Sequence, residues 1–345
     1  MKNKILKIIL SISFLTQVCP VHAGVGEWTS LGPENSRVQT IALNLDDAVN
    51  PQKILIGTEA GVLVSLDFGS TWAPTATQPR DVNVFSLVKV PGVAGKFYAG
   101  TDQHGIFVTT DSGATWTALS SQPADLHVSA LAIDPTNINT IYAGTAEGLF
   151  VSTNSGDSWA LTAAQPVDHL TIRALVFDSM VPHKLYVGTY VGIFYTTDGG
   201  ATWSATSAQP TRTDPPNPRV TSLAMDPVVS GKIYAGTYYE GIFTSEDAGA
   251  HWTPFDIQPP TLHPSALMIS TATHIPTFYA GIYRSSLHVL QAPGCGNRVV
   301  ESSRGETCDD GNITSGDGCS TTCEIESTPS RIDATTAAGC SLIPF

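Results

Sequence analysis

The stretch from Ser65 to Trp72 reads Ser-Leu-Asp-Phe-Gly-Ser-Thr-Trp, and the stretch from Thr109 to Trp116 reads Thr-Thr-Asp-Ser-Gly-Ala-Thr-Trp. The same pattern occurs three more times and ends at Trp159, Trp203 and Trp252. In such a segment, Asp accepts backbone N–H bonds across a tight turn, Gly adopts angles that other residues resist, and Trp packs against the sheet. The repeat therefore predicts five hairpin turns.

The acidic position and the tryptophan of this repeat are assigned a structural role, not a catalytic one, because the turn uses the hydrogen-bonding capacity of the carboxylate. The residues with this role are Asp67, Asp111, Asn154, Asp198, Asp247, Trp72, Trp116, Trp159, Trp203 and Trp252. Asn154 replaces Asp in the third copy, and His251 replaces Thr in the fifth. Asn can also form the turn, so neither change is expected to break the fold.

A second signature, a glycine tripeptide such as Ala143-Gly144-Thr145, precedes each turn and occurs once more after the last one. Its glycines are Gly57, Gly100, Gly144, Gly188, Gly236 and Gly281, with spacings of 43, 44, 44, 48 and 45 residues. Each unit shows four short strand patterns and no helical periodicity. A repeat of this length without helices predicts the four-stranded antiparallel blades of a β-propeller.

The sixth unit has three strand patterns but lacks the turn motif and a fourth strand. The segment Glu27 to Leu31 resembles the Trp-led fourth strands at Trp116 to Leu119 and Trp252 to Phe255. It is predicted to complete the last blade and so remove the open sheet edges. The fold class is all-β, with a six-bladed propeller over residues 24–292 and a small disulfide-rich C-terminal module.

The turn motif resembles the Asp-box, or bacterial neuraminidase repeat, and the resemblance extends from Trp28 to about Gln291. Asp-box propellers include sialidases, sortilin-type receptors, xyloglucanase-type glycoside hydrolases and photosystem II assembly factors, so the resemblance implies a fold and leaves the activity open. The Arg-Ile-Pro-like motif of sialidases is missing, and xyloglucanase-type enzymes use a cleft between two propellers. The prediction is a binding or scaffolding module for a carbohydrate or an extracellular protein, without catalytic residues. A glycoside hydrolase is the alternative.

Charge and N-terminal composition indicate an exported protein. The chain has 17 Lys and Arg against 30 Asp and Glu, a net charge of -13, which disfavours nucleic acid and anionic membranes as partners. Residues 1–23 combine three lysines, an apolar run and Val21-His22-Ala23, which predicts a signal peptide. No later run is long enough for an integral membrane span. A secreted or cell-surface monomer is expected.

A ligand site is expected on the face opposite the Asp-boxes, where loops join the second to the third strand and one blade to the next. Aligning the first strands places Arg37, Asn83, His127, Thr171, Arg219 and His263 in one ring near the central channel. The predicted ligand-binding residues are Arg37, His127, Arg219, His263, Glu147, Glu240, Tyr190, Tyr238, Tyr239 and Arg284. They suit an anionic or sugar-like ligand, with the tyrosines as stacking surfaces. The alternative is a solvated channel mouth.

Residues 294–324 contain four cysteines in the order Cys295, Cys308, Cys319 and Cys323. With Cys-Asp-Asp-Gly-Asn at 308–312, they resemble the cysteine-rich repeat of myxobacterial surface proteins, and in an exported chain they predict two disulfides of open pairing. Zinc is disfavoured because no His lies nearby. Asp309, Asp310, Asn312 and Asp317 offer oxygen ligands for calcium, with turn formation as the preferred explanation. No other cofactor is expected, and residues 325–345 are predicted to be a flexible tail.

Overall fold

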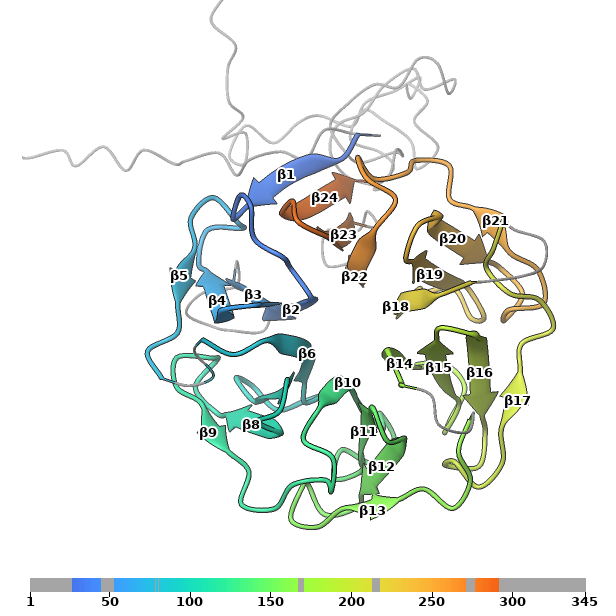
Figure 1. The fold of residues 1–345 in the computed structure, drawn as a ribbon, viewed down its shortest axis with the longest axis horizontal. Helices are drawn as coiled ribbons and strands as arrows, with labels where there is room; N and C mark the ends of the chain where they lie inside the picture. Colours follow the sequence, from blue (N-terminus) through green and yellow to red (C-terminus); the bar gives the residue numbers. More distant parts are fainter. Residues whose placement is uncertain are drawn as a thin grey trace, which may run out of the picture.

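The computed structural model describes residues 27–44, 53–77, 79, 81–166, 171–212, 218–270 and 277–291. Over this part of the chain there are 24 strands in six four-stranded antiparallel sheets and no helix, hence none that could span a membrane. The sheets stand as blades around a central opening (Figure 1). The predicted all-β, six-bladed propeller is confirmed. The predicted signal peptide, cysteine module, calcium ligands and tail lie outside the described residues.

The blades follow the chain, with the first strand of each nearest the centre (Figure 1). Blade 1 contains β2 (Thr40–Asn44), β3 (Lys53–Thr58), β4 (Gly61–Ser65) and β5 (Ala73–Pro74). Blade 2 contains β6 (Val84–Lys89), β7 (Phe97–Thr101), β8 (Ile106–Thr109) and β9 (Thr117–Ala118). Blade 3 contains β10 (Val128–Ile133), β11 (Ile141–Thr145), β12 (Leu149–Ser152) and β13 (Ala160–Leu161).

The second half of the ring repeats this arrangement. Blade 4 contains β14 (Ala174–Phe177), β15 (Leu185–Thr189), β16 (Gly192–Thr196) and β17 (Ser204–Ala205). Blade 5 contains β18 (Val220–Met225), β19 (Ile233–Thr237), β20 (Gly241–Ser245) and β21 (Thr253–Pro254). Blade 6 contains β22 (Pro264–Ser270), β23 (Thr277–Ile282), β24 (Leu287–Gln291) and β1 (Thr29–Gly32).

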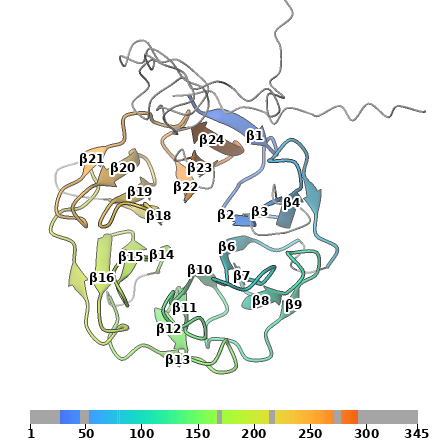
Figure 2. The same cartoon turned by 180° about the vertical axis from the view of Figure 1, so that it is seen from behind.

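The N-terminal strand β1 lies at the outer edge of blade 6, where it pairs antiparallel with β24 (Figures 1 and 2). Thr29 stands opposite Val289 in this pairing. Trp28 Nε1 donates a hydrogen bond of 2.8 Å to the carbonyl oxygen of Ile257 in the preceding blade. The first described residues therefore supply the fourth strand of the last blade.

The Asp-box of blade 4 shows how the repeated turn is held. Asp198 Oδ1 accepts from the Thr202 backbone N–H at 2.9 Å, and Asp198 Oδ2 accepts from the Thr202 hydroxyl at 2.6 Å. Thr196 Oγ1 donates to the same carboxylate and accepts from the Gly200 N–H. Because these donors stabilise the charged form, with the Thr202 hydroxyl first among them, the pKa of Asp198 falls to about 2. The carboxylate is used within its own turn.

The two variant boxes keep the same geometry with different chemistry. Asn154 Oδ1 accepts from the Ser158 N–H at 2.9 Å, and its Nδ2 donates to the Ser158 hydroxyl. His251 stands where the other boxes have Thr or Ser, and its Nδ1 lies 2.6 Å from Asp247 Oδ2. Each substitution therefore preserves the contact across the turn.

The repeated glycine allows adjacent blades to approach closely. A Cβ atom on Gly144 would lie 2.4 Å from Ile172 Cγ2 in the next blade. The same contact recurs around the ring in the pairs Gly57–Val84, Gly100–Val128, Gly144–Ile172, Gly188–Val220, Gly236–Pro264 and Gly281–Val38. The same second strands also carry large buried side chains, such as Phe97 and Tyr186, so the small residue is confined to the glycine position. The glycine signature is therefore an inter-blade packing device.

Four glutamines at the start of blade-to-blade loops hold the outer strand against the third one. Gln122 Oε1 accepts from the Ile106 N–H at 2.7 Å, while its Nε2 donates to the Ile106 and Leu119 carbonyls. The equivalent residues Gln165, Gln209 and Gln258 accept in the same way from the third strand of their own blade. These side chains are part of the scaffold although they lie on the same face as the predicted ligand site.

Candidate functional site

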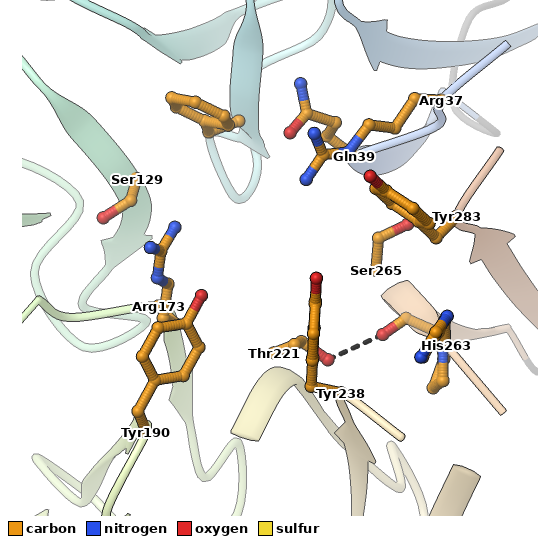
Figure 3. Close-up of a pocket in the computed structure, with 12 residues that line it drawn as sticks. Arg37, Gln39, Ser129, Arg173, Tyr190, Thr221, Tyr238, His263, Ser265 and Tyr283 are labelled. Carbon is orange, nitrogen blue, oxygen red and sulfur yellow. Dashed lines mark hydrogen bonds between the residues drawn. The ribbon is translucent and has the colours of Figure 1, made fainter. Parts of the chain in front are cut away.

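A cavity of about 90 Å³ lies at the centre of the ring, on the face opposite the Asp-boxes. Residues from the first strands and from the loops between second and third strands surround it (Figure 3). The lining residues are Arg37, Gln39, Phe85, Ser129, Arg173, Tyr190, Thr221, Tyr238, His263, Pro264, Ser265 and Tyr283. Below it the first strands enclose a central channel of about 190 Å³. The cavity is thus the upper end of the propeller channel.

One residue from each blade forms a ring at the bottom of the cavity: Gln39, Phe85, Ser129, Arg173, Thr221 and Ser265. The small members of this ring bond to the backbone. Ser129 Oγ donates to the carbonyls of Gly144 and Ile172, and Thr221 Oγ1 donates to those of Gly236 and Pro264 (Figure 3). Because these hydroxyls are occupied, the arginine of the ring is the group best placed to meet a ligand.

Two arginines enter the cavity from opposite sides, and both guanidinium groups point into the opening (Figure 3). The Arg37 guanidinium carbon lies 4.6 Å from the centre of the Tyr283 ring, and that of Arg173 lies 4.7 Å from the Tyr190 ring. In each arginine the Nε atom is buried without a hydrogen-bond partner. Stacking on tyrosine positions a guanidinium without neutralising its charge.

The electrostatics of the cavity contrast with those of the whole protein. The chain carries a net charge of -13, yet the twelve lining residues include two arginines and no Asp or Glu. Neither arginine forms an ion pair with a carboxylate among the residues that the structure describes. The cavity therefore presents an uncompensated positive charge, which favours an anionic ligand.

An aromatic cluster borders the cavity between blades 5 and 6. The rings of Tyr238 and His263 stack with centroids 5.1 Å apart, and Tyr239 meets the His263 ring edge-on at 4.4 Å. Burial lowers the pKa of His263 below its ordinary value, so the imidazole is neutral at pH 7. A neutral imidazole both donates and accepts hydrogen bonds, which suits sugar hydroxyls.

Four of the ten predicted ligand-binding residues line the cavity: Arg37, Tyr190, Tyr238 and His263. Three more stand beside it. The guanidinium carbon of Arg219 lies 6.0 Å from the Tyr238 ring, that of Arg284 lies 5.2 Å from the Tyr283 ring, and Tyr239 packs on His263. These seven residues form one neighbourhood around blades 4, 5, 6 and 1.

The other three predicted residues do not line the cavity. His127 Nδ1 lies 2.7 Å from Asp102 Oδ1, and its ring packs against Phe85. The Glu240 carboxylate accepts from the Thr211 hydroxyl and from the Arg212 backbone N–H. Glu147 is exposed on the loop between β11 and β12.

Sequence reasoning missed Arg173 and the rest of the ring at the bottom of the cavity. The aligned ring reaches the cavity at Arg37 and His263, but in blade 4 it contained Thr171. The residue two positions later lines the cavity in every blade. Strand alternation could have shown this. Val128 and Ile172 are β-branched residues that face the glycine of the preceding blade, so the residue after each of them must point to the channel.

A second signal for the site was that arginines and lysines lie on opposite faces of the propeller. Every arginine within the described ranges lies on the cavity face: Arg37, Arg173, Arg212, Arg219 and Arg284. Every lysine there lies near the turns between first and second strands, on the Asp-box face: Lys53, Lys89, Lys96, Lys184 and Lys232. The planar guanidinium fork matches carboxylates and stacks on aromatic rings, so this bias points to the cavity face as the binding face.

No group of three or more His, Cys, Asp or Glu residues suited to a metal ion occurs within the described ranges. The predicted calcium ligands of the C-terminal module are outside them. The cavity chemistry is therefore that of arginine, tyrosine, histidine and hydroxyl groups.

The family profile described as the BNR/Asp-box repeat matches residues 194–205, in the Asp-box hairpin of blade 4. No curated protein matches the chain significantly. Among solved structures, an ancestral GH74 enzyme is 20% identical with a TM-score of 0.55, and the match covers 74% of this chain and 36% of the enzyme. The GH74 xyloglucanase from Xanthomonas campestris is 16% identical with a TM-score of 0.56, covering 77% of this chain and 55% of the enzyme.

An auxiliary nutrient binding protein from Bacteroides thetaiotaomicron is 12% identical, with a TM-score of 0.57 and coverage of 75% of this chain and 70% of that protein. At these identities the likeness shows the fold alone. The chain spans about a third of one GH74 enzyme and about half of the other. The repeated turns, the six blades and these matches agree: the chain is a six-bladed β-propeller built from BNR/Asp-box repeats.

Proposed function

We propose that the chain is a binding module whose central cavity holds the anionic group of a carbohydrate. The observation that carries this proposal is the pair Arg37 and Arg173, which face the same opening without a carboxylate among the residues lining it. Both side chains are partly buried, and the Nε atom of each lacks a hydrogen-bond partner, so a bound carboxylate or sulfate would add charge-assisted hydrogen bonds.

The remaining lining groups favour a sugar as the carrier of that anion. Tyr190, Tyr238 and Tyr283 present ring faces and hydroxyls around the opening, and His263 adds a neutral imidazole. Aromatic faces pack against the C–H faces of sugar rings, while the hydroxyls and the imidazole fix orientation. The predicted export of the chain would place this site among extracellular glycans.

Binding is favoured over hydrolysis by the same lining. A glycosidase of the usual kind needs two carboxyl groups about 5 to 10 Å apart on either side of the scissile bond. None of the twelve residues around the cavity is Asp or Glu. GH74 enzymes and a nutrient binding protein both use related propellers, so the scaffold itself permits either role.

Calorimetric titration with an oligogalacturonate, a sulfated galactan oligomer and a neutral galactan oligomer tests the proposal. Binding of at least one acidic oligomer, with no binding of the neutral one, is expected. Arg37→Gln and Arg173→Gln should each weaken that binding by at least about tenfold, since charge-assisted hydrogen bonds contribute about 1.5 to 3 kcal/mol. Lys96→Gln removes the same charge from the opposite face and is the matched control.

Three results would overturn the proposal. Equal affinity for neutral and acidic oligomers would remove the role of the arginines. Release of shorter sugars during incubation would identify an enzyme. Failure of both acidic oligomers to bind would leave an extracellular protein as the partner class to be pursued.

A further inference from the structure

We propose, resting on the function proposed above, that the ligand is an oligomer of acidic sugars and that Tyr239 and Arg219 form a second subsite for its next unit. This subsite lies outside the cavity, at its border on blade 5. It would make the protein selective for chain length as well as for charge.

The loops between second and third strands divide the cavity face into two halves. In blades 1 to 3 these loops carry the acidic residues Glu59, Asp102 and Glu147. In blades 4 to 6 they carry instead the residues Tyr190, Tyr238, Tyr239, Glu240, Tyr283 and Arg284. An acidic chain that leaves the cavity is repelled by the first half and finds aromatic and cationic groups on the second.

An unbroken set of ring contacts leads from the cavity to Tyr239. His263 and Tyr238 line the cavity, and both touch the Tyr239 ring, with centroids at 4.4 and 4.2 Å respectively. Tyr239 itself does not line the cavity and is 57% exposed. A large aromatic side chain that is exposed and yet fixed by two ring contacts is a ready stacking surface for a sugar.

Arg219 supplies the charge of the second subsite. Its guanidinium carbon lies 6.0 Å from the Tyr238 ring, on an exposed residue that directly precedes β18. The pKa of Tyr239 is raised chiefly by its hydrogen bond with Tyr238, and the positive charge of Arg219 opposes that rise. An anionic group beside Tyr239 would therefore meet a cation.

The carboxylate that follows Tyr239 in the sequence is already occupied. Glu240 accepts from the Thr211 hydroxyl and the Arg212 backbone N–H, which ties it to the loop between blades 4 and 5. Both of these hydrogen bonds join the Glu240 carboxylate to residues of that loop. Arg219 forms no ion pair with Glu240 within the described structure, so its charge stays available to a ligand.

The test is the dependence of affinity on ligand length, measured by calorimetry with the monomer, dimer and tetramer of galacturonic acid and with sulfated oligomers of the same lengths. In the unmodified protein, affinity should rise by about tenfold or more from monomer to dimer in the series that binds. Tyr239→Ala and Arg219→Gln should remove most of this gain and leave the affinity for the monomer within about twofold.

Two further variants separate stacking from folding and from general effects on this face. Tyr239→Phe keeps the ring and should retain the gain with length. Leu126→Ala truncates another exposed side chain on the same face, over the acidic half, and should behave like the unmodified protein. Loss of monomer binding on Tyr239→Ala would show that Tyr239 belongs to the cavity and contradict a separate subsite.

The two proposals fail in different ways. Arginine-dependent binding of the monomer without any gain from monomer to dimer would overturn the second subsite and leave the anion-binding cavity intact. A gain with length that Tyr239→Ala and Arg219→Gln do not reduce would also overturn it. Equal binding of neutral oligomers would overturn the proposed function itself.

Discussion

At the scale of single residues, equivalent tyrosines of neighbouring blades differ in one hydrogen bond. Tyr142 donates its hydroxyl to the Gly199 carbonyl at 3.1 Å, in the Asp-box of the next blade. The Tyr186 hydroxyl occupies the same place one blade later and is buried without a partner. Burial raises the pKa of both phenols, so both are neutral at all moderate pH values. The pair isolates the contribution of one inter-blade hydrogen bond.

Tyr142→Phe is therefore expected to lower the free energy of unfolding by about 1 kcal/mol, the usual net contribution of such a bond. Tyr186→Phe should be neutral or slightly stabilising, because it removes an unsatisfied buried hydroxyl. Urea unfolding of the two variants, followed by tryptophan fluorescence, provides the comparison. Equal losses in both would show that the Tyr142 bond contributes nothing specific.

At the scale of strands, the contact between each repeated glycine and the first strand of the next blade sets how closely the blades pack. Gly144 and Ile172 are the tightest such pair with apolar atoms on both sides, because a Cβ at Gly144 would lie 2.4 Å from Ile172 Cγ2 and 2.7 Å from its Cβ. Neither β11 nor the segment before β14 can move away without disturbing its own sheet. The strain of a larger side chain must be absorbed at this contact.

Gly144→Ala is expected to destabilise the protein by about 1 to 3 kcal/mol, the usual cost of overpacking a core. Ile172→Ala should relieve the clash, so the double variant should be more stable than the sum of the two single effects allows. Thermal and urea unfolding of the four proteins give the coupling. Strict additivity would mean that the two residues do not press on each other.

At the scale of the whole molecule, four Asp-box carboxylates link stability to pH. The pKa of Asp198 and of Asp247 lies at about 2, and those of Asp67 and Asp111 are also lowered from 3.8. Hydrogen bonds from the Thr202 hydroxyl and from His251 are the first causes for Asp198 and Asp247. Because the folded pKa is below the unfolded one, the native state binds fewer protons.

The stabilisation from these carboxylates is thus fully present above about pH 4 and is lost as the pH falls toward 2. Asp198→Asn imitates the natural Asn154 box and removes one titrating group. The variant should be less stable than the unmodified protein at pH 7, and the difference should shrink between pH 4 and 2. Melting temperatures across this range test the expectation, and a constant difference would contradict it.

The sequence predicts the blades of the propeller more completely than it predicts the lining of the cavity. The blades and their number follow from a repeat whose residues act locally, since Asp198, Gly200 and Thr202 are joined by hydrogen bonds within their own turn. The lining of the cavity depends on strand register at the centre of the ring. In blade 4 the predicted position was Thr171, and the residue that lines the cavity is Arg173, two positions later. Loop residues such as Glu240 form hydrogen bonds with residues far away in the sequence, here Thr211, and no local sequence pattern specifies these partners.

The pairing of β1 with β24 has a consequence for folding. It joins segments that are far apart in the chain, as the contact between the Ser30 and Ser286 hydroxyls shows, because the two residues are 256 positions apart. Closing so long a loop is slow, because the chain loses entropy before the contact forms. Until then β24 keeps an open edge able to pair with another molecule. During synthesis the ring of blades therefore stays open until β24 has emerged, and its closure depends on the N-terminal strand β1.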